Sequence, residues 1–142
     1  LKAAAVAAAD EARRLSVIRP KLLAVTVLTS IDADEWKKLG HTNSISQSVL
    51  TMAGAAKAAG MDGTVSSPHE AAEIRRLNGS DFLIVTPGIR PSFAQSDDQK
   101  RITTPKEAVQ NGATHLVVGR PITKAADPQE AARAIAEEIR EV

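Results

Sequence analysis

Cysteine is absent from this 142-residue sequence, and aromatic residues are almost absent. Without cysteine there are no disulfides and no thiol chemistry, which is compatible with a reducing cytoplasm. The aromatic residues are Trp36, Phe82 and Phe93, so the chain offers no stacking platform for nucleic-acid bases. No apolar run approaches the roughly 20 residues that a membrane-spanning helix needs. These absences argue against a disulfide scaffold, a nucleic-acid partner and insertion into a membrane.

The sequence also lacks an excess of charge and a cluster of metal ligands. Its 18 Lys and Arg residues nearly balance 17 Asp and Glu residues, which leaves a net charge of +1 and no field that would attract nucleic acid or anionic lipid. The histidines, His41, His69 and His115, are far apart and have no metal-ligand spacing. We therefore expect a cytoplasmic globular protein without a metal site.

Four apolar segments have the composition of parallel strands that are covered on both faces. The first, residues 21–30, follows Pro20 and is rich in Val and Leu without strong alternation. Shorter candidates follow at residues 63–67, 82–86 and 115–119. The segments between them are long enough for the helices of βαβ crossovers. This alternation predicts a parallel α/β fold.

The expected helices have marked starts and ends. Three starts share a capping side chain, then Pro, then Glu three positions after the cap: Ser67, Thr104 and Asp127. The Glu side chain can reach back to the cap, and Pro suits the first helical position. Three helical segments are followed by a glycine that can adopt the left-handed conformation: Gly60, Gly79 and Gly112.

Apolar stripes predict which helix faces pack on the sheet. One stripe lies within residues 44–59 and consists of Ile45, Val49, Met52, Ala53 and Ala56. A second lies on the last helix and consists of Ala131, Ile135, Ile139 and Val142. Both have the helical period of a core-facing surface and are expected to face the sheet rather than to bind a cofactor.

The order of elements is an Ala-rich opening helix, with neither an initial Met nor a cap, followed by four βα units. Four units are half of an eight-stranded barrel. Such a half would leave its end strands unpaired and one sheet face uncovered. We therefore expect either that further residues of the polypeptide or a partner chain complete the barrel, or that the sheet is a small open one with helices on both faces.

Ligands of parallel α/β proteins bind at the carboxyl ends of the strands. Thr29 and Ser30 end the first predicted strand, whereas Ser67 ends the second with the expected task of a helix cap. A long polar connection runs from residue 87 to residue 103 and contains Arg90 and Gln99. Long loops of this kind are usually functional, so we expect a lid over a charged ligand, with a solvated surface loop as the alternative.

Gly119 and Arg120 follow the fourth predicted strand. Glycine lets a ligand approach the backbone, and the planar fork of Arg suits two phosphate oxygens. The phosphate sites of eight-stranded barrels are often built with a short extra helix, and the following segment PITKA has the right length for one. The pattern therefore favours a phosphorylated small ligand.

Five segments together resemble the orotidine 5′-phosphate decarboxylase family: LLAVTVLTS, AAGMDGTVSSPHEA, LIVTPGIRP, DDQKRITTPKEAVQNGATHLVVGRPIT and ADPQEAARAI. They span nearly the whole chain in the family's order and spacing, with small departures at Thr64 and Ser66. The resemblance implies a (β/α)8 TIM barrel of the α/β class. In that barrel, residues 1–142 would be the C-terminal half of a single domain, with about the last four βα units, and the N-terminal half would lie outside this sequence.

The resemblance also implies an activity, the conversion of orotidine 5′-monophosphate (OMP) to uridine 5′-monophosphate (UMP) and CO2 without metal or organic cofactor. Thr29 would hydrogen-bond the pyrimidine, Arg90 and Gln99 would belong to the loop that closes on the nucleotide, and Gly119 with Arg120 would hold the 5′-phosphate. The family's catalytic Asp-x-Lys-x-x-Asp motif is not in this sequence. The catalytic Lys and Asp residues are therefore expected in the N-terminal half.

Family members are homodimers, so the resemblance implies a homodimer with a nucleotide ligand. Two other functions stay open from the sequence. One is a related phosphate-binding barrel, either a sugar-phosphate decarboxylase or an aldol-type synthase. The other is a non-catalytic half-barrel that binds a nucleotide.

Overall fold

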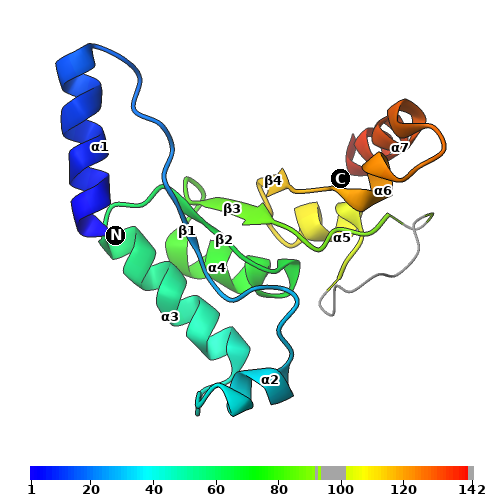
Figure 1. Ribbon diagram of the computed structural model, residues 1–142, viewed down its shortest axis with the longest axis horizontal. Coiled ribbons are helices and arrows are strands. Elements are labelled where there is room, and N and C mark those ends of the chain that lie inside the picture. Colours follow the sequence, from blue (N-terminus) through cyan, green and yellow to red (C-terminus); the bar gives the residue numbers. More distant parts are fainter. Residues whose placement is uncertain (92, 94–101, 141–142) are drawn as a thin grey trace.

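The structure is a computed structural model that describes residues 1–91, 93 and 102–140. Figure 1 shows α1 at one end of the molecule and α7 at the other, with the sheet between them. The elements in chain order are α1 (Lys2–Leu15), β1 (Leu23–Val25), α2 (Ala33–Lys38), α3 (Ile45–Ala58), β2 (Gly63–Val65), the 3-10 helix η1 (Pro68–Glu70), α4 (Ala71–Asn78), β3 (Leu83–Thr86), α5 (Pro105–Gln110), β4 (His115–Leu116), α6 (Arg120–Thr123) and α7 (Pro128–Arg140). No helix among the described residues is long and apolar enough to cross a membrane.

The four predicted strands form one sheet, in which β1, β2, β3 and β4 pair in chain order. All three pairings are parallel, and Ala24, Thr64 and Ile84 are in register across the first three strands. The predicted parallel α/β organisation is therefore confirmed. Each strand is shorter than its apolar segment.

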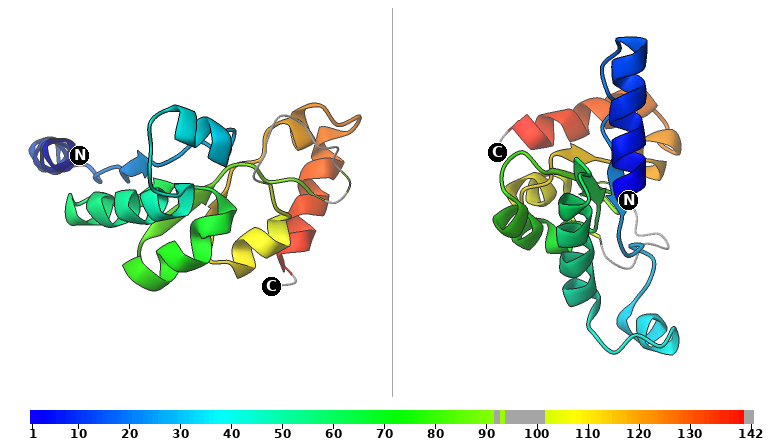
Figure 2. Two further views of the ribbon diagram at one scale, coloured as in Figure 1. Left: turned by 90° about the horizontal axis from the view of Figure 1, so that it is seen from below. Right: turned by 90° about the vertical axis from the view of Figure 1, so that its left-hand side faces the viewer.

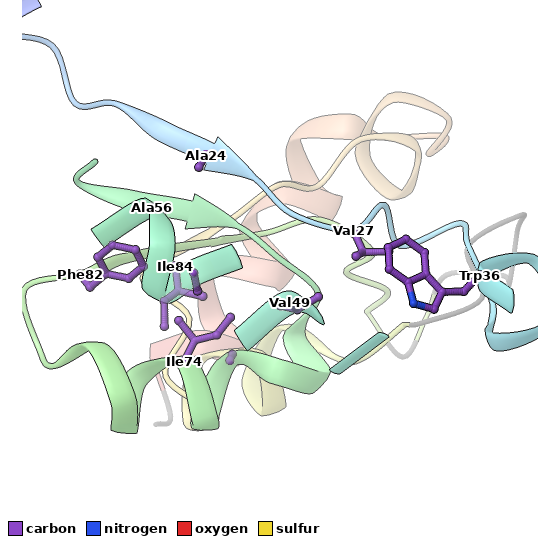
Figure 3. Packing of buried hydrophobic residues seen from close by; sticks show 10 residues of the cluster. Ala24, Val27, Trp36, Val49, Ala56, Ile74, Phe82 and Ile84 are labelled. Carbon is purple, nitrogen blue, oxygen red and sulfur yellow. The ribbon is translucent and has the colours of Figure 1, made fainter. Parts of the chain in front are cut away.

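Helices cover one face of this sheet. Helix α3 packs against β2, and α4 packs against β3 (Figures 1 and 2). Figure 3 shows the core that they enclose, which consists of Ala24, Val27, Trp36, Val49, Ala53, Ala56, Ala71, Ile74, Phe82 and Ile84. Each large apolar side chain buried there contributes about 1.5–3 kcal/mol to folding.

The predicted stripe on α3 is confirmed in part. Val49, Ala53 and Ala56 are fully buried, but Met52 is 43% exposed. The buried alanines bring α3 close to the sheet and α4, so the buried strip is narrow and the neighbouring Met52 stays outside it. On α7, Ala131 and Ile135 are buried as predicted. Ile139 is only partly buried, and Val142 lies outside the described residues.

The opposite face of the sheet is largely open. Side chains alternate along a strand, so Val25 points away from the face that carries Ala24, and it is 62% exposed. Val117, just after β4, is 51% exposed. In the described part of the chain, β1 and β4 each pair with one other strand. The two open edges and the uncovered face are those expected of half a barrel.

The helix caps match the sequence pattern at some positions and not at others. Thr104 and Glu107 form the predicted reciprocal capping box at the start of α5, and Asp127 accepts a hydrogen bond from the Glu130 N–H. The prediction at Ser67 was wrong in part: Ser67 caps the 3-10 helix η1, but the Glu70 side chain accepts a hydrogen bond from Ser46. The tighter turn of η1 makes Glu70 buried, so it packs under α3 instead of reaching back.

Two further capping boxes were not predicted, one from Asp32 and Glu35 on α2 and one from Ser44 and Gln47 on α3. Neither has the Pro that marks the predicted helix starts. The predicted glycine stops are confirmed, because φ is +83°, +83° and +94° at Gly60, Gly79 and Gly112.

The amino-terminal edge of the sheet is held together by two charged side chains. Asp62, directly before β2, accepts hydrogen bonds of 2.7 and 2.8 Å from Arg19 and of 2.8 Å from the Leu22 N–H. Arg75 on α4 donates to the carbonyls of Gly79, Ser80, Phe82 and Gly112, which lie in the loops before β3 and β4. Asp62 and Arg75 together join the starts of neighbouring strands. These contacts lie at the edge opposite the carboxyl ends of the strands.

Gly63 on β2 lies directly against Leu83 of β3, and we predict that a side chain at this position destabilises the fold. A Cβ atom at Gly63 would lie 2.2 Å from the Leu83 carbonyl oxygen. Gly63→Ala should therefore lower the free energy of unfolding by about 1–3 kcal/mol in chemical denaturation. The control is Gly54→Ala in α3, where nothing lies within 4 Å and which should raise stability by about 0.5–1 kcal/mol. Equal effects of the two variants would contradict the prediction.

The second prediction concerns acid stability. Burial would raise the pKa of Asp62, but hydrogen bonds from Leu22, Arg19 and Lys21 outweigh it and hold this pKa below its ordinary value of 3.8. A pKa lowered by folding stabilises the fold above the unfolded value, and this stabilisation is lost as the pH falls through 3.8 and then through the folded value. Asp62→Asn should therefore cost about 1–3 kcal/mol at pH 7 and progressively less below pH ~4.

Denaturation curves of both forms between pH 7 and pH ~2 measure this difference. Asp81→Asn is the control, since Asp81 is exposed and its removal changes the net charge equally. A difference between wild type and Asp62→Asn that stays constant down to the lowest pH would contradict the prediction.

Candidate active site

The carboxyl ends of β1, β2 and β3 enclose a hollow of about 210 Å³. Its lining residues come from the loop after β1 and from the ends of the next two strands: Val25, Val27, Leu28, Thr29, Ser30, Val65, Ser66 and Pro87. The predicted site residue Thr29 is only 6% exposed, so its position in the wall is fixed. Thr29 and Ser30, which follow β1, thus share one hollow with residues at the ends of β2 and β3.

A chain of buried hydroxyl groups lies beside this hollow. The Thr26 hydroxyl is 2.9 Å from the Val65 carbonyl oxygen and 3.2 Å from the Ser66 hydroxyl. Ser66 in turn donates to the Thr64 hydroxyl over 3.0 Å. All three side chains are at least nine-tenths buried. They join the end of β1 to the end of β2 below the turn that carries Thr29. Thr64 and Ser66 are thus partners in one network.

The long connection after β3 begins and ends side by side. Ile89 and Thr103 form an isolated parallel bridge. The Arg90 N–H donates to the Thr103 carbonyl over 2.9 Å, and the Thr103 N–H to the Gly88 carbonyl over 3.4 Å. The Arg90 guanidinium, which is partly buried, donates through Nη1 to the Ile89 carbonyl. The predicted site residue Arg90 is therefore held at the base of the connection, whereas Gln99 lies outside the described residues.

Glu107 accepts hydrogen bonds from the end of this connection. Its Oε2 accepts hydrogen bonds from the Thr103 hydroxyl, 2.6 Å away, and from the Thr104 N–H, 3.2 Å away. The hydrogen bond from Thr103, followed by those from Thr104, holds the pKa of Glu107 below its ordinary value. The carboxylate is therefore charged at neutral pH, when these hydrogen bonds are strongest.

Gly119 and Arg120 lie where β4 gives way to α6. Gly119 precedes the helix, and its carbonyl accepts from the Ile122 and Thr123 N–H groups. A Cβ atom at Gly119 would have no heavy atom within 4 Å, so the space beside this backbone is open to a ligand. Arg120 is the first residue of α6, the predicted short extra helix, and is partly buried.

β3 and β4 are neighbours in the sheet, so Arg90 and the Gly119–Arg120 pair follow adjacent strands. The hollow that contains Thr29 lies at the ends of β1, β2 and β3. Acidic and histidine side chains do not gather in the same way. In residues 1–91, 93 and 102–140, no group of three or more His, Cys, Asp or Glu side chains could hold a metal ion. The described site therefore offers hydroxyls, backbone groups and arginines, a set suited to a polar anionic ligand.

A larger cavity, of about 500 Å³, was not predicted from the sequence. It lies between α2, the start of α3 and η1, and its lining includes Trp36, Asn43, Ser46, His69 and Glu70. The Trp36 ring stacks on His41 with centroids 3.6 Å apart. These residues come from separate segments with no shared motif, which is why the sequence pattern carries no signal for the cavity.

The fold and the site define a class of protein. A parallel sheet with its strands in chain order, with helices on one face and polar loops at the carboxyl ends, is about half of a (β/α)8 barrel. The chain belongs to the orotidine 5′-phosphate decarboxylase / HUMPS family, whose model matches residues 1–135. The family predicted from the sequence motifs is thereby confirmed.

Similar proteins support this assignment. The chain is 58% identical over 121 residues to an orotidine 5′-phosphate decarboxylase of Trichlorobacter lovleyi, covering 85% of this chain and 50% of the relative. It is 49% identical over 137 residues to that of Rhodospirillum rubrum, covering 96% of this chain and 56% of the relative. The crystal structure of orotidine 5′-phosphate decarboxylase from Lactobacillus acidophilus matches with a TM-score of 0.71 and 43% identity, over 87% of this chain and 50% of that one.

The chain thus spans about half the length of these relatives. This proportion agrees with the four strands of the sheet, since a complete barrel of this type has eight. The predicted fold class, half of an eight-stranded barrel, is confirmed.

We predict that the hydroxyl chain beside the hollow stabilises the folded state. Thr26→Val keeps the shape of the side chain but leaves Ser66 without one of its partners, so it should cost about 1–2 kcal/mol of unfolding free energy. Thr51→Val is the control, because its hydroxyl bonds a carbonyl within α3 on an exposed surface and should change stability by less than about 0.5 kcal/mol. Denaturant titration measures both, and equal small losses would contradict the prediction.

Proposed function

We propose that the polypeptide that carries this chain is an orotidine 5′-phosphate decarboxylase, which converts OMP to UMP and CO2. The observation that carries the proposal is the position of Thr29, Arg90 and Gly119–Arg120 at the carboxyl ends of the strands of a chain from this family. Along this edge, Thr29 and Ser30 follow β1, and Arg90 and Arg120 follow β3 and β4. A pyrimidine nucleotide, with a polar ring and a phosphate, has the complementary arrangement.

Each site residue has a proposed role. Thr29 hydrogen-bonds the pyrimidine from the wall of the hollow. Gly119 lets the phosphate approach the open backbone after β4, and Arg120 holds two of its oxygens through its planar fork. Arg90, together with Gln99 in the undescribed part of the connection, completes the enclosure of the nucleotide.

The chemistry that we propose needs no metal and no organic cofactor. The bond between pyrimidine C6 and the carboxylate breaks, CO2 leaves, and the electron pair stays on C6 as a carbanion. A lysine ammonium stabilises this carbanion electrostatically and then supplies the proton that forms UMP. We propose that this lysine and its carboxylate partners belong to the other half of the barrel, since the family's Asp-x-Lys-x-x-Asp motif is not in these residues.

The phosphate site then contributes to the rate as well as to affinity. The phosphate takes no part in bond breaking, but its binding energy can hold the pyrimidine at the reacting groups. A homodimer in the cytoplasm is part of the same proposal, with family resemblance as its support and the cysteine-free composition compatible with it.

Decarboxylation of OMP by the full-length polypeptide tests the proposal. Purified protein should release CO2 from OMP, bind UMP in calorimetric titration, and prefer UMP to a pentulose phosphate. Preference for the sugar phosphate would instead assign a related barrel enzyme. Binding of UMP without turnover would assign a non-catalytic nucleotide-binding protein.

The variant Arg120→Ala tests the phosphate site. Loss of a bidentate charged contact should reduce kcat/KM for OMP by about 100-fold or more, mainly through a higher KM. Affinity for uridine, which has no phosphate, should change by less than about twofold. The matched control is Arg133→Ala on α7, which removes an exposed arginine paired with Glu130 and should leave both values unchanged. An equal loss for OMP and uridine would mean that Arg120 acts only in folding.

A further inference from the structure

The described residues at the end of the long connection, Ile102–Thr104, are fixed from three sides. From the segment after β3, Gly88 and Arg90 join Thr103 through the two backbone hydrogen bonds of the bridge. The other two sides are held by side chains, His69 from the segment after β2 and Glu107 from α5.

His69 holds the first residue of this stem. Its Nε2 lies 3.2 Å from the Ile102 carbonyl oxygen. A carbonyl oxygen can only accept, so Nε2 carries the proton and donates. His69 itself is placed by η1, where Ser67 accepts a hydrogen bond from the His69 N–H. The end of β2 is thereby linked to the segment that pairs with Arg90.

Glu107 holds the other end of the stem. One carboxylate oxygen accepts from the hydroxyls of Thr103 and Thr104 and from the Thr104 N–H, at 2.6, 3.0 and 3.2 Å. The capping of α5 needs only the hydrogen bonds with Thr104. The bond to Thr103 is additional, and Thr103 is the residue whose carbonyl accepts the Arg90 N–H.

We propose that His69 and Glu107 are positioning residues, which place Arg90 for the anionic group of the ligand by fixing the stem Ile102–Thr104. Both side chains are on exposed residues and contribute little apolar burial, so core packing does not require them. Both hydrogen bonds hold Thr103 or its neighbour Ile102 in place. Thr103 in turn forms the bridge with Ile89 and accepts the Arg90 N–H, so both side chains fix the backbone at Arg90. This inference rests on the proposed function, because Arg90 meets a nucleotide only there.

The test uses the full-length polypeptide and calorimetric titration with UMP and uridine. His69→Ala and Glu107→Ala should each weaken UMP binding by about tenfold, the loss expected for a charged or well-aligned hydrogen bond. Uridine, which lacks the anionic group, should bind within about twofold of wild type. A residue that served only folding would lower both affinities together or neither.

Conservative variants provide the rescue. The amide of His69→Gln can still donate to the Ile102 carbonyl, and the carbonyl of Glu107→Gln can still accept from Thr103, so both should keep UMP affinity within about threefold of wild type. Glu130→Ala is the control for Glu107→Ala, since Glu130 is also exposed, occupies the corresponding position near the start of α7 and lies in another element. It should leave both affinities unchanged.

The possible outcomes separate this inference from the proposed function. Wild type that binds UMP more tightly than uridine, with the preference reduced by the alanine variants and kept by the glutamine variants, supports the inference. Unchanged preference in His69→Ala and Glu107→Ala overturns it and leaves the proposed function standing. Wild type without preference for UMP over uridine overturns the proposed function itself, and the inference with it.

Discussion

The parallel pairing of four very short strands is the constraint on which the rest of the structure depends. Parallel strands end at the same edge of the sheet, so pairing in chain order brings the loops after β1, β2, β3 and β4 into one row. Because the regular ladder spans only two to four residues in each strand, it cannot by itself fix those loops. The hydroxyl chain beside the hollow does so through side chains, and the Ile89–Thr103 bridge does so through backbone hydrogen bonds.

The two edges of the sheet have different tasks. At the amino-terminal edge, Asp62 and Arg75 make dense networks of charge-assisted hydrogen bonds that join the strand starts. At the carboxyl-terminal edge, most of the hydrogen bonds described above join neutral hydroxyls and backbone groups. Arg90 and Arg120 follow β3 and β4 at this edge. The charged networks thus lie at the edge opposite the proposed ligand site, which is the usual division in barrels of this class.

Local patterns predicted much of the fold. The apolar segments, the glycine stops and the box at Thr104 depend on neighbours in the sequence, and the structure confirms them. Met52 differs from prediction because its burial depends on how closely α3 approaches the sheet, whereas Glu70 differs because its side chain meets Ser46 on α3. For the candidate site, the strand-end rule selected Thr29 and Gly119, and the structure places them after β1 and β4. The contacts of Ser66 with Thr26, of Thr103 with Arg90 and of His69 with Ile102 join segments distant in the sequence, for which a single sequence has no periodic signal.

The open sheet face with Val25 and Val117 bears on the free energy of unfolding of this chain. Exposed valines and unpaired strand edges raise the free energy of the sheet until something covers them, and covering them stabilises both partners at once. Where further strands complete the barrel, as we propose, the unfolding of these residues is thermodynamically coupled to that of the added strands. A substitution as remote from the open edges as Gly63→Ala would then weaken both halves together, and the cooperative folding unit would extend beyond the sheet that these residues form.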